Sequence, residues 1–281
     1  MLREITVRAF AKINLDLHVL GVRPDGYHEL RTTFQSVALS DVLTFTRTRG
    51  PFRIECDDPA FPTDRTNLIW KAAERLMRLS RRRDIPSGVT VHVEKNIPMQ
   101  SGLGGGSSDA AATLRALSVL WRVKVSDAEL RHAAAAIGAD VPYFLEGGTA
   151  IGFHRGDLIV PLDDIPRAWA VIVVPEFGVS TKEAFAWWDQ GRQDRRDGRR
   201  KQTANDLQAV VSKRHPIVTT LVRALKKHGA FHASLSGSGS AVFGLFRRRP
   251  AAQAAARLLS GPRTFVTPTL DRKRCRRLAA K

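Results

Sequence analysis

The chain has 281 residues, of which 43% are hydrophobic and 26% charged, and its formal net charge is +18. This length and composition exclude a fibrous or disordered chain and predict one large domain or two ordinary ones with a real core. No apolar run approaches the ~20 residues that a membrane span needs, and the start of the chain lacks a signal peptide's apolar core. We therefore expect a globular cytoplasmic protein.

Cysteine and histidine give no sign of a metal site, because Cys56, Cys275 and eight scattered histidines lack metal-ligand spacing. The positive charge comes in blocks at 81–83, 192–201, 247–249 and 272–277. Strongly basic proteins bind nucleic acids, anionic membranes or small polyanions. These blocks fall at predicted loops and element ends without interleaved aromatic residues, so we interpret them as solvated surface.

The first half of the chain is predicted to be rich in strands. Alternating apolar residues predict strands at 2–10, 12–20, 37–46 and 52–56, and a helix from Asn67. Alternating valines predict a strand over 87–98, and an apolar stripe predicts a helix over 108–121. A capping box at Ser126 opens the next helix, and Gly138 suits its end.

The second half mixes strands and helices. It begins with predicted strands at 149–153, 158–161 and 169–174. A polar insert at 189–203 follows, which we expect to be exposed and mobile. After it come a helix at 216–228, paired strands at 231–235 and 241–246, a helix ending at Leu259, and a basic tail. This order predicts an α+β fold of two lobes that divide near residue 160.

A glycine-rich loop between the predicted strand 87–98 and the predicted helix 108–121 is the strongest local signal. It comprises Pro98, Met99, Gln100, Ser101, Gly102, Leu103, Gly104, Gly105, Gly106, Ser107 and Ser108. Glycine backbone approaches a ligand closely, and a helix N-terminus adds unpaired N–H donors and a positive dipole end. The loop is neither a Walker A nor a Rossmann sequence, and its context favours a phosphate site over a merely flexible, capped loop.

A second glycine loop, SLSGSGSAVFGLF at 234–246, contains Gly237 and Ser238. By itself this loop fits a flexible hairpin equally well. Two glycine loops in one chain favour a nucleotide-binding cleft between two lobes.

Asp140 and Lys12 are the candidate catalytic pair. Asp140 follows a predicted helix and precedes Pro142, which we expect to hold the segment extended rather than helical. An aspartate at such a place is usually a turn former, but a buried one kept ionised by a cation can act as general base for an alcohol. Lys12, on an otherwise apolar strand, is the candidate cation, and the alternative is a lysine that snorkels from an edge strand. The sequence by itself does not place the two in contact.

Five segments in this order carry a family resemblance: AKINLDLHVLGVRPDGYHEL at 11–30, PMQSGLGGGSSDAA at 98–111, GADVPYF at 138–144, TANDLQ at 203–208 and SGSGSAVF at 236–243. Together they resemble the GHMP kinases, such as galactokinase, homoserine kinase and mevalonate kinase. The DGYHEL ending of the first segment narrows the resemblance to the family that uses ATP to phosphorylate the 2-hydroxyl of a cytidine-diphosphate-linked methylerythritol, in the non-mevalonate isoprenoid route.

The resemblance implies a two-lobed GHMP kinase fold. Residues 1–160 would form an N-terminal α/β lobe that binds ATP, carries the catalytic residues and contains a left-handed βαβ crossover. Residues 161–281 would form a ferredoxin-like C-terminal lobe that closes the substrate cleft.

The resemblance also implies roles for individual residues. Lys12 and Asp140 fall on the catalytic positions, the glycine loop 98–108 on the ATP phosphates, and Asn67 and Lys95 near the adenine end. The implied substrate residues are Asn14 at the sugar alcohol and diphosphate, Tyr27 and His28 at the cytosine, Phe185 as the opposite stacking face, and Gly237 and Ser238 in the second loop. ATP and Mg²⁺ are the implied cofactors; the metal ligands stay open, with Ser107 or Ser108 as candidates.

Two other functions stay open. A GHMP kinase for another small alcohol, such as homoserine or mevalonate, would not need Tyr27 and His28. A non-catalytic RNA-binding protein would use the +18 charge but leaves the glycine loops, Lys12 and Asp140 unexplained. We expect a small-molecule substrate, a monomer or homodimer, and no membrane or nucleic-acid partner.

Overall fold

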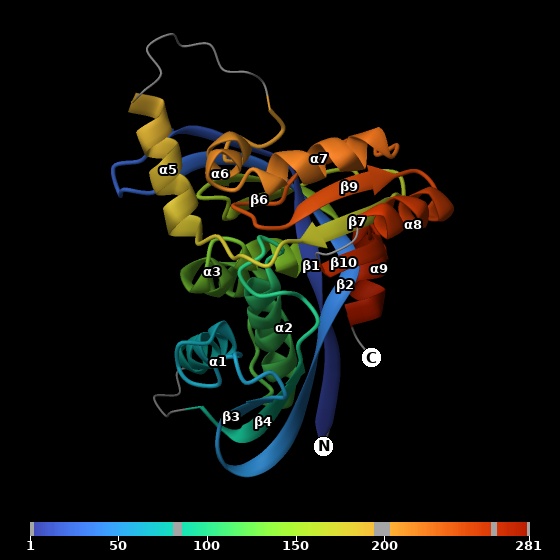
Figure 1. Ribbon diagram of the computed structural model, residues 1–281. Helices are drawn as coiled ribbons and strands as arrows, with labels where there is room; N and C mark the ends of the chain where they lie inside the picture. The colour runs from blue at the N-terminus through green and yellow to red at the C-terminus, as the bar shows by residue number, and fades with distance from the viewer. Residues whose placement is uncertain (1–2, 81–85, 194–202, 260–262, 280–281) are drawn as a thin grey trace.

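The computed structural model describes residues 3–80, 86–193, 203–259 and 263–279. Its first part carries a six-stranded sheet and its second part a four-stranded sheet, and helices pack on both (Figure 1). The first part contains β1 Glu4–Val22, β2 His28–Pro51, β3 Arg53–Cys56, α1 Leu68–Leu79, β4 Ser87–Glu94, α2 Gly105–Leu120, α3 Asp127–Ile137, α4 Val141–Glu146, β5 Thr149–His154 and β6 Leu158–Pro161. The second part contains β7 Trp169–Val174, α5 Thr181–Gln193, α6 Gln208–Arg214, α7 Ile217–Lys227, β8 His232–Leu235, β9 Val242–Phe246, α8 Arg249–Leu258, β10 Arg263–Pro268 and α9 Arg272–Ala279.

The long strand β2 organises the first sheet. It pairs antiparallel with β1, with β4 through its second half and with β5 through its first half. β3 and β4 are parallel and are joined through α1, which forms the βαβ unit that the family resemblance predicts. Leu43, Phe45 and Val91 of this sheet are fully buried in one core with Leu76 of α1 and Leu114 of α2. This packing fixes the start of α2 relative to β1.

The second sheet has the antiparallel strand order β10-β7-β9-β8. Numbered along the chain, this is the order 4-1-3-2 of a ferredoxin-like βαββαβ unit, with α5 to α7 in the first crossover and α8 in the second. Valines and leucines of α7, of β7 and of β9 share a second core (Figure 1). The predicted α+β fold with a ferredoxin-like C-terminal part is therefore confirmed.

The bounds of the first strands differ from their predictions. The predicted strands 2–10 and 12–20 are one strand, β1, with a register shift between Phe10 and Ala11 that interrupts its apolar alternation. The strand predicted at 37–46 extends over 28–51 as β2, because its first half is covered by β1 and β5 rather than by a single core face.

Three helices overturn sequence expectations. Pro142 does not hold its segment extended, because it occupies the first turn of α4, where the missing N–H has no intrahelical acceptor. The expected basic tail is ordered as β10 and α9, so the block 272–277 lies on a helix rather than in a loop. Residues 189–193 of the expected polar insert end α5, and the rest of that insert, 194–202, lies outside the described residues.

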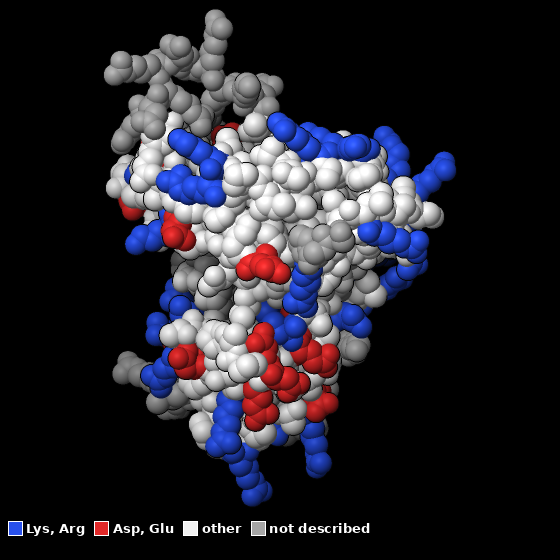
Figure 2. All heavy atoms as spheres, viewed as in Figure 1, with Lys and Arg blue, Asp and Glu red and all other residues white. Residues whose placement is uncertain are grey.

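Charge is unevenly distributed over the visible face. Lysines and arginines gather on the half that carries α7 and α8, whereas aspartates and glutamates gather on the other half (Figure 2). Within the described ranges, no helix has the length and apolar character of a membrane span.

Candidate functional site

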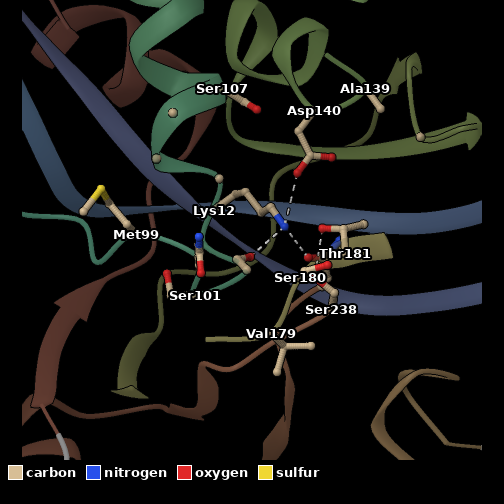
Figure 3. A pocket seen from close by; sticks show the side chains of 18 of the residues that line it. Lys12, Met99, Ser101, Ser107, Ala139, Asp140, Val179, Ser180, Thr181 and Ser238 are labelled. Atoms are coloured by element: carbon tan, nitrogen blue, oxygen red, sulfur yellow. Dashed lines mark hydrogen bonds and ion pairs between the residues drawn. The ribbon is translucent and has the colours of Figure 1, made fainter. Parts of the chain in front are cut away.

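A pocket of about 630 Å³ lies where the two glycine loops meet. Its lining includes Lys12 of β1, Asp140 before α4, Lys95 after β4 and Thr181 of α5, so elements of both sheets build it (Figure 3). This is a suitable volume for a small-molecule ligand.

Lys12 reaches the pocket because of the irregularity in β1. The register shift precedes it, and its backbone N–H donates to the carbonyl of Leu103 in the first glycine loop at 3.0 Å. Bulges of this kind re-aim a side chain while the strand continues. The strand is thereby attached to the loop at the residue that carries the charge.

The Lys12 ammonium is buried, with a side chain only 3% exposed, and three oxygen atoms surround it. It donates to Asn14 Oδ1 at 2.6 Å and to the carbonyl of Gly102 at 2.8 Å, and it lies 3.5 Å from Asp140 Oδ2 (Figure 3). Burial lowers the pKa of Lys12, while the Asp140 carboxylate opposes that change. The structure thus brings the predicted catalytic pair together, with Asp140 half-buried rather than buried.

The first glycine loop delivers the N-terminus of α2 to the pocket. Gly102 and Gly104 adopt positive φ angles of 76° and 72°, and a Cβ on Gly104 would meet the Phe144 ring at 2.7 Å. Gly104 is the N-cap and has no side chain to accept from the first turn. The N–H groups of Gly105 and Gly106 have no intrahelical acceptor, so they are donors available to an anion in the pocket.

The second glycine loop packs directly against the first. Ser236 Oγ donates to the carbonyl of Gly102 at 3.0 Å, and Ala241 N–H donates to the carbonyl of Ser101 at 2.9 Å. The buried Asn205 side chain donates to the carbonyls of Leu235 and Gly237. The loop is therefore tied into the pocket wall and is not a free hairpin.

Lys95 occupies the floor of the pocket beside the glycine loop. Its ammonium contacts Asp41 and lies 3.2 Å from Asp109 Oδ2, and a Cβ on Gly105 would approach it within 2.8 Å. Burial disfavours the charged lysine, but Asp109 and Asp41 outweigh burial and raise the pKa of Lys95. The charge of Lys95 is thus compensated within the protein.

Asp109, one of the two carboxyl groups beside Lys95, is deeply buried and, among the described residues, incompletely hydrogen-bonded. It is 1% exposed, and its Oδ1 has no hydrogen-bond partner within the described part of the chain. Burial raises the pKa of Asp109 to about 8; the Lys95 ammonium opposes the rise and the Asp41 carboxylate adds to it. Asp41 differs, because its Oδ1 accepts from the N–H groups of Asn96 and Ile97.

Asn67 lines the pocket but also has a structural role. It is the N-cap of α1, and its Oδ1 accepts from Ile69 N–H at 2.9 Å. The side-chain oxygen is therefore committed to the helix.

The aromatic residues predicted for cytosine form a cluster at one end of the pocket. Phe185 lines the pocket, and His28 stacks on it with 4.5 Å between ring centroids and donates through Nε2 to Asp189 Oδ1 at 2.9 Å. Tyr27 is 56% exposed and lies outside the pocket lining, as does His28. The structure thus brings Phe185 and His28 together but does not place Tyr27 opposite Phe185.

Most of the predicted ligand-binding residues line this one pocket. Besides those described, they are Asn14, Pro98, Met99, Gln100, Ser101, Ser107, Gly237 and Ser238. Leu103 and Ser108 do not line it, and both residues are buried. Sequence reasoning missed Thr32, Thr181 and Arg155, although Thr181 follows directly on the GVS segment that precedes Phe185.

The lining also fits a magnesium ion that arrives with substrate phosphates. Asp140 is the carboxylate of the lining and Ser107 is one of its hydroxyl groups, whereas Ser108 does not line the pocket. The described residues contain no group of three histidine, cysteine, aspartate or glutamate side chains that could hold a metal. Mg²⁺ is commonly held by one or two carboxylates together with substrate phosphates, so this small donor set suffices.

Comparison with known protein families matches two stretches of the chain. The GHMP kinases N terminal domain matches residues 67–148, and the GHMP kinases C terminal domain matches residues 192–261. The 4-diphosphocytidyl-2-C-methyl-D-erythritol kinase of Moorella thermoacetica is 40% identical over 286 residues, which cover 95% of this chain and 99% of the relative. The kinase of the same name from Solibacter usitatus is 40% identical over 303 residues, with 98% and 92% covered.

Solved structures point to the same family as the sequence relatives. The crystal structure of a 4-(cytidine 5'-diphospho)-2C-methyl-D-erythritol kinase superposes with a TM-score of 0.78 at 30% identity and covers 94% of this chain and 99% of that one. A homoserine kinase from Cytophaga hutchinsonii, at 21% identity and a TM-score of 0.64 with 96% and 98% covered, shares the fold. The chain is therefore a small-molecule kinase that belongs to the 4-diphosphocytidyl-2-C-methyl-D-erythritol kinase family of the GHMP kinases.

Proposed function

We propose that the chain transfers the γ-phosphoryl group of ATP to the 2-hydroxyl of 4-diphosphocytidyl-2-C-methyl-D-erythritol, a step of the non-mevalonate route to isoprenoid precursors. One observation carries the proposal: the buried Lys12 ammonium lies 3.5 Å from Asp140 in the same pocket that the glycine loop lines. A base, a cation and an anion-binding helix terminus therefore share one cavity, which is what phosphoryl transfer to an alcohol requires.

Each part of the pocket has a role in this reaction. The N–H groups at the start of α2 bind the ATP phosphates and offset their charge. The 2-hydroxyl oxygen attacks the γ-phosphorus as the bond from the γ-phosphorus to the β–γ bridging oxygen breaks, and the hydroxyl proton passes to the Asp140 carboxylate. Lys12 orients the hydroxyl and offsets negative charge beside Asp140, and its contacts with Asn14 and Gly102 hold it in place.

Magnesium, when bound with ATP, neutralises charge on the β- and γ-phosphates. Ser107 and Asp140 are the pocket residues that would contact it. The remaining groups of the wall position the substrates and exclude water.

The aromatic cluster supports a cytidine-linked substrate over other small alcohols. Phe185 offers an aromatic ring to the pocket, and His28 fixes that ring from behind through stacking. Homoserine and mevalonate contain no base that would use such a ring. The relatives of known name at 40% identity act, by their names, on the cytidine-linked alcohol.

The test is an assay of ADP release with purified full-length protein, ATP and Mg²⁺. We expect turnover with 4-diphosphocytidyl-2-C-methyl-D-erythritol and none above background with homoserine or mevalonate. Equal or better turnover of either of those two alcohols would reassign the protein to another GHMP activity.

A further inference from the structure

Arg155 lies on a strained turn at the rim of the pocket. The turn joins β5 to β6; His154 in it has a φ of 58° and Gly156 a φ of 91°. Arg155 and Gly156 both line the pocket, and about a third of the Arg155 side chain is exposed. The turn therefore places an arginine in the lining of the cavity, on a segment separate from the glycine loop.

Asp157 holds this guanidinium in one orientation. Arg155 Nε and Nη2 donate to the same carboxylate oxygen, Asp157 Oδ2, at 3.0 and 2.6 Å, and the Asp157 side chain is only 14% exposed. A guanidinium has five N–H donors, so this pair leaves three of them outside the ion pair. A planar, oriented edge with free donors suits phosphate oxygens.

Arg155 also contacts Tyr27. Its Cζ lies 5.0 Å from the centroid of the Tyr27 ring, so the guanidinium covers one face of an aromatic side chain that is otherwise 56% exposed. This cation–π contact limits the ring's rotation, and the exposed part of the ring is accessible to a base. Arg155 thereby connects Tyr27, which lies outside the pocket lining, to the pocket itself.

The other two cations of the pocket have strong internal partners. Lys12 lies beside Asp140, and Lys95 lies between Asp41 and Asp109. The side chains of both lysines are buried, whereas Arg155 is about a third exposed and, among the described residues, keeps three N–H donors outside its ion pair. Arg155 is therefore the cation that would contact the phosphate groups of a ligand bound near Tyr27.

We propose that Arg155 is a specificity-determining residue that binds the nucleoside diphosphate end of the acceptor substrate. Its free N–H donors contact a phosphate oxygen, and its plane backs Tyr27 so that the opposite ring face receives the base. The inference rests on the proposed function for the identity of the substrate, and it adds a residue and a role to that function.

Calorimetric binding of cytidine diphosphate tests this role without any turnover. In R155A we expect the affinity for cytidine diphosphate to fall about 10- to 100-fold, the range for losing hydrogen bonds from a charged group. The calorimetric affinity for ATP should stay at its wild-type value. R155K should fall between wild type and R155A, because it keeps the charge but loses the planar fork.

Arg247→Ala is the matched control. Arg247 also covers an exposed ring, with its Cζ 5.4 Å from the centroid of Phe231, but it lies outside the pocket lining. R247A should bind cytidine diphosphate like the wild type, and thermal unfolding of both variants checks that they are folded. Wild-type affinity in R155A, or an equal loss of ATP and cytidine diphosphate affinity, overturns the proposal.

The outcomes separate this inference from the proposed function. One outcome is that the wild type binds cytidine diphosphate through Arg155 without phosphorylating the cytidine-linked alcohol. That result would support the Arg155 site and refute the proposed acceptor substrate. Wild-type protein that phosphorylates that alcohol, with an unchanged KM in R155A, supports the kinase substrate and refutes the role of Arg155.

Discussion

Lys12 shows how burial and partners together make a charged residue useful. An ammonium buried to this degree would be costly without partners, and Asn14, Gly102 and Asp140 supply them. Because Asn14 Nδ2 in turn donates to Thr32 Oγ1 at 2.8 Å, the amide oxygen of Asn14 is aimed at Lys12. The position of the cation is therefore set by a network of buried groups.

Replacing Asp140 by asparagine tests the proposed base. We expect kcat to fall by about 10²- to 10⁴-fold, the usual contribution of a general base, because asparagine cannot accept the hydroxyl proton. ATP affinity measured without Mg²⁺ should stay largely intact, since the glycine loop is untouched. Steady-state ADP release gives kcat and calorimetry gives ATP affinity; full activity in D140N would refute the assignment.

Asp109 should make stability depend on pH. The unfolded chain releases this proton near pH ~4 and the folded protein near pH 8, so between these values the native state binds more protons. Stability contributed by this group therefore falls as the pH rises through that window. The wild type should lose on the order of 3–4 kcal/mol of stability between about pH 5 and pH 8 through this group, and D109N should not show that loss.

Urea unfolding at several pH values measures this effect as the difference between wild type and variant. Asp163→Asn, at an exposed position, is the control and should keep the wild-type pH profile. A D109N profile parallel to that of the wild type would contradict a raised pKa at Asp109.

At the level of elements, the two glycine loops act as one unit. The first loop needs Gly102 because its φ is 76° and because a Cβ there would clash with the carbonyl oxygen of Ser236. The second loop supplies that carbonyl, and Asn205 anchors the loop through the carbonyls of Leu235 and Gly237. The shape of the phosphate-binding wall thus depends on a contact between distant segments.

Gly102→Ala and Gly26→Ala separate backbone strain from this contact. Gly26 has a φ of 81° and open space around its Cα, so G26A should cost only about 1–2 kcal/mol for the left-handed conformation. G102A should cost about 1–3 kcal/mol more for overpacking and should also weaken ATP binding. Urea unfolding and calorimetry measure both; equal losses in the two variants would mean that the loops do not interlock as described.

At the level of the whole molecule, β1 and β2 belong to both halves. Leu17, Val19 and Leu30 pack into the core of the second sheet, whereas Ala9 and Leu43 pack into the core of the first. Thr269, after β10, bridges to Val37 of β2. The division of the chain into two lobes near residue 160 stays a proposal. β1 and β2, which pack into both cores, connect the two proposed lobes.

We expect the protein to unfold in a single cooperative transition, because neither core is complete without β1 and β2. Differential scanning calorimetry should give one peak with equal calorimetric and van't Hoff enthalpies. Two resolved peaks, or a calorimetric enthalpy well above the van't Hoff value, would show that the halves unfold independently.

Elements with strong local signals were predictable from the sequence. The capping box at Ser126 forms as expected at the start of α3, and the strands after Gly148 lie where their alternation indicates. Elements whose stability comes from tertiary contacts were missed. α9 is an example, because its basic sequence resembles a tail until Cys275 packs against Phe10 and Leu270.

The residue types of the site can be read from the chain alone: two glycine loops, a lysine on an apolar strand and an aspartate before a proline. Which of these residues come into contact depends on the fold. Lys12 pairs with Asp140, Lys95 with Asp41 and Asp109, and Arg155 with Tyr27, all across separate elements. Local sequence patterns act only over a few neighbouring residues. These contacts instead depend on how the first sheet packs against α2, and on how the second sheet packs against the first sheet and α2.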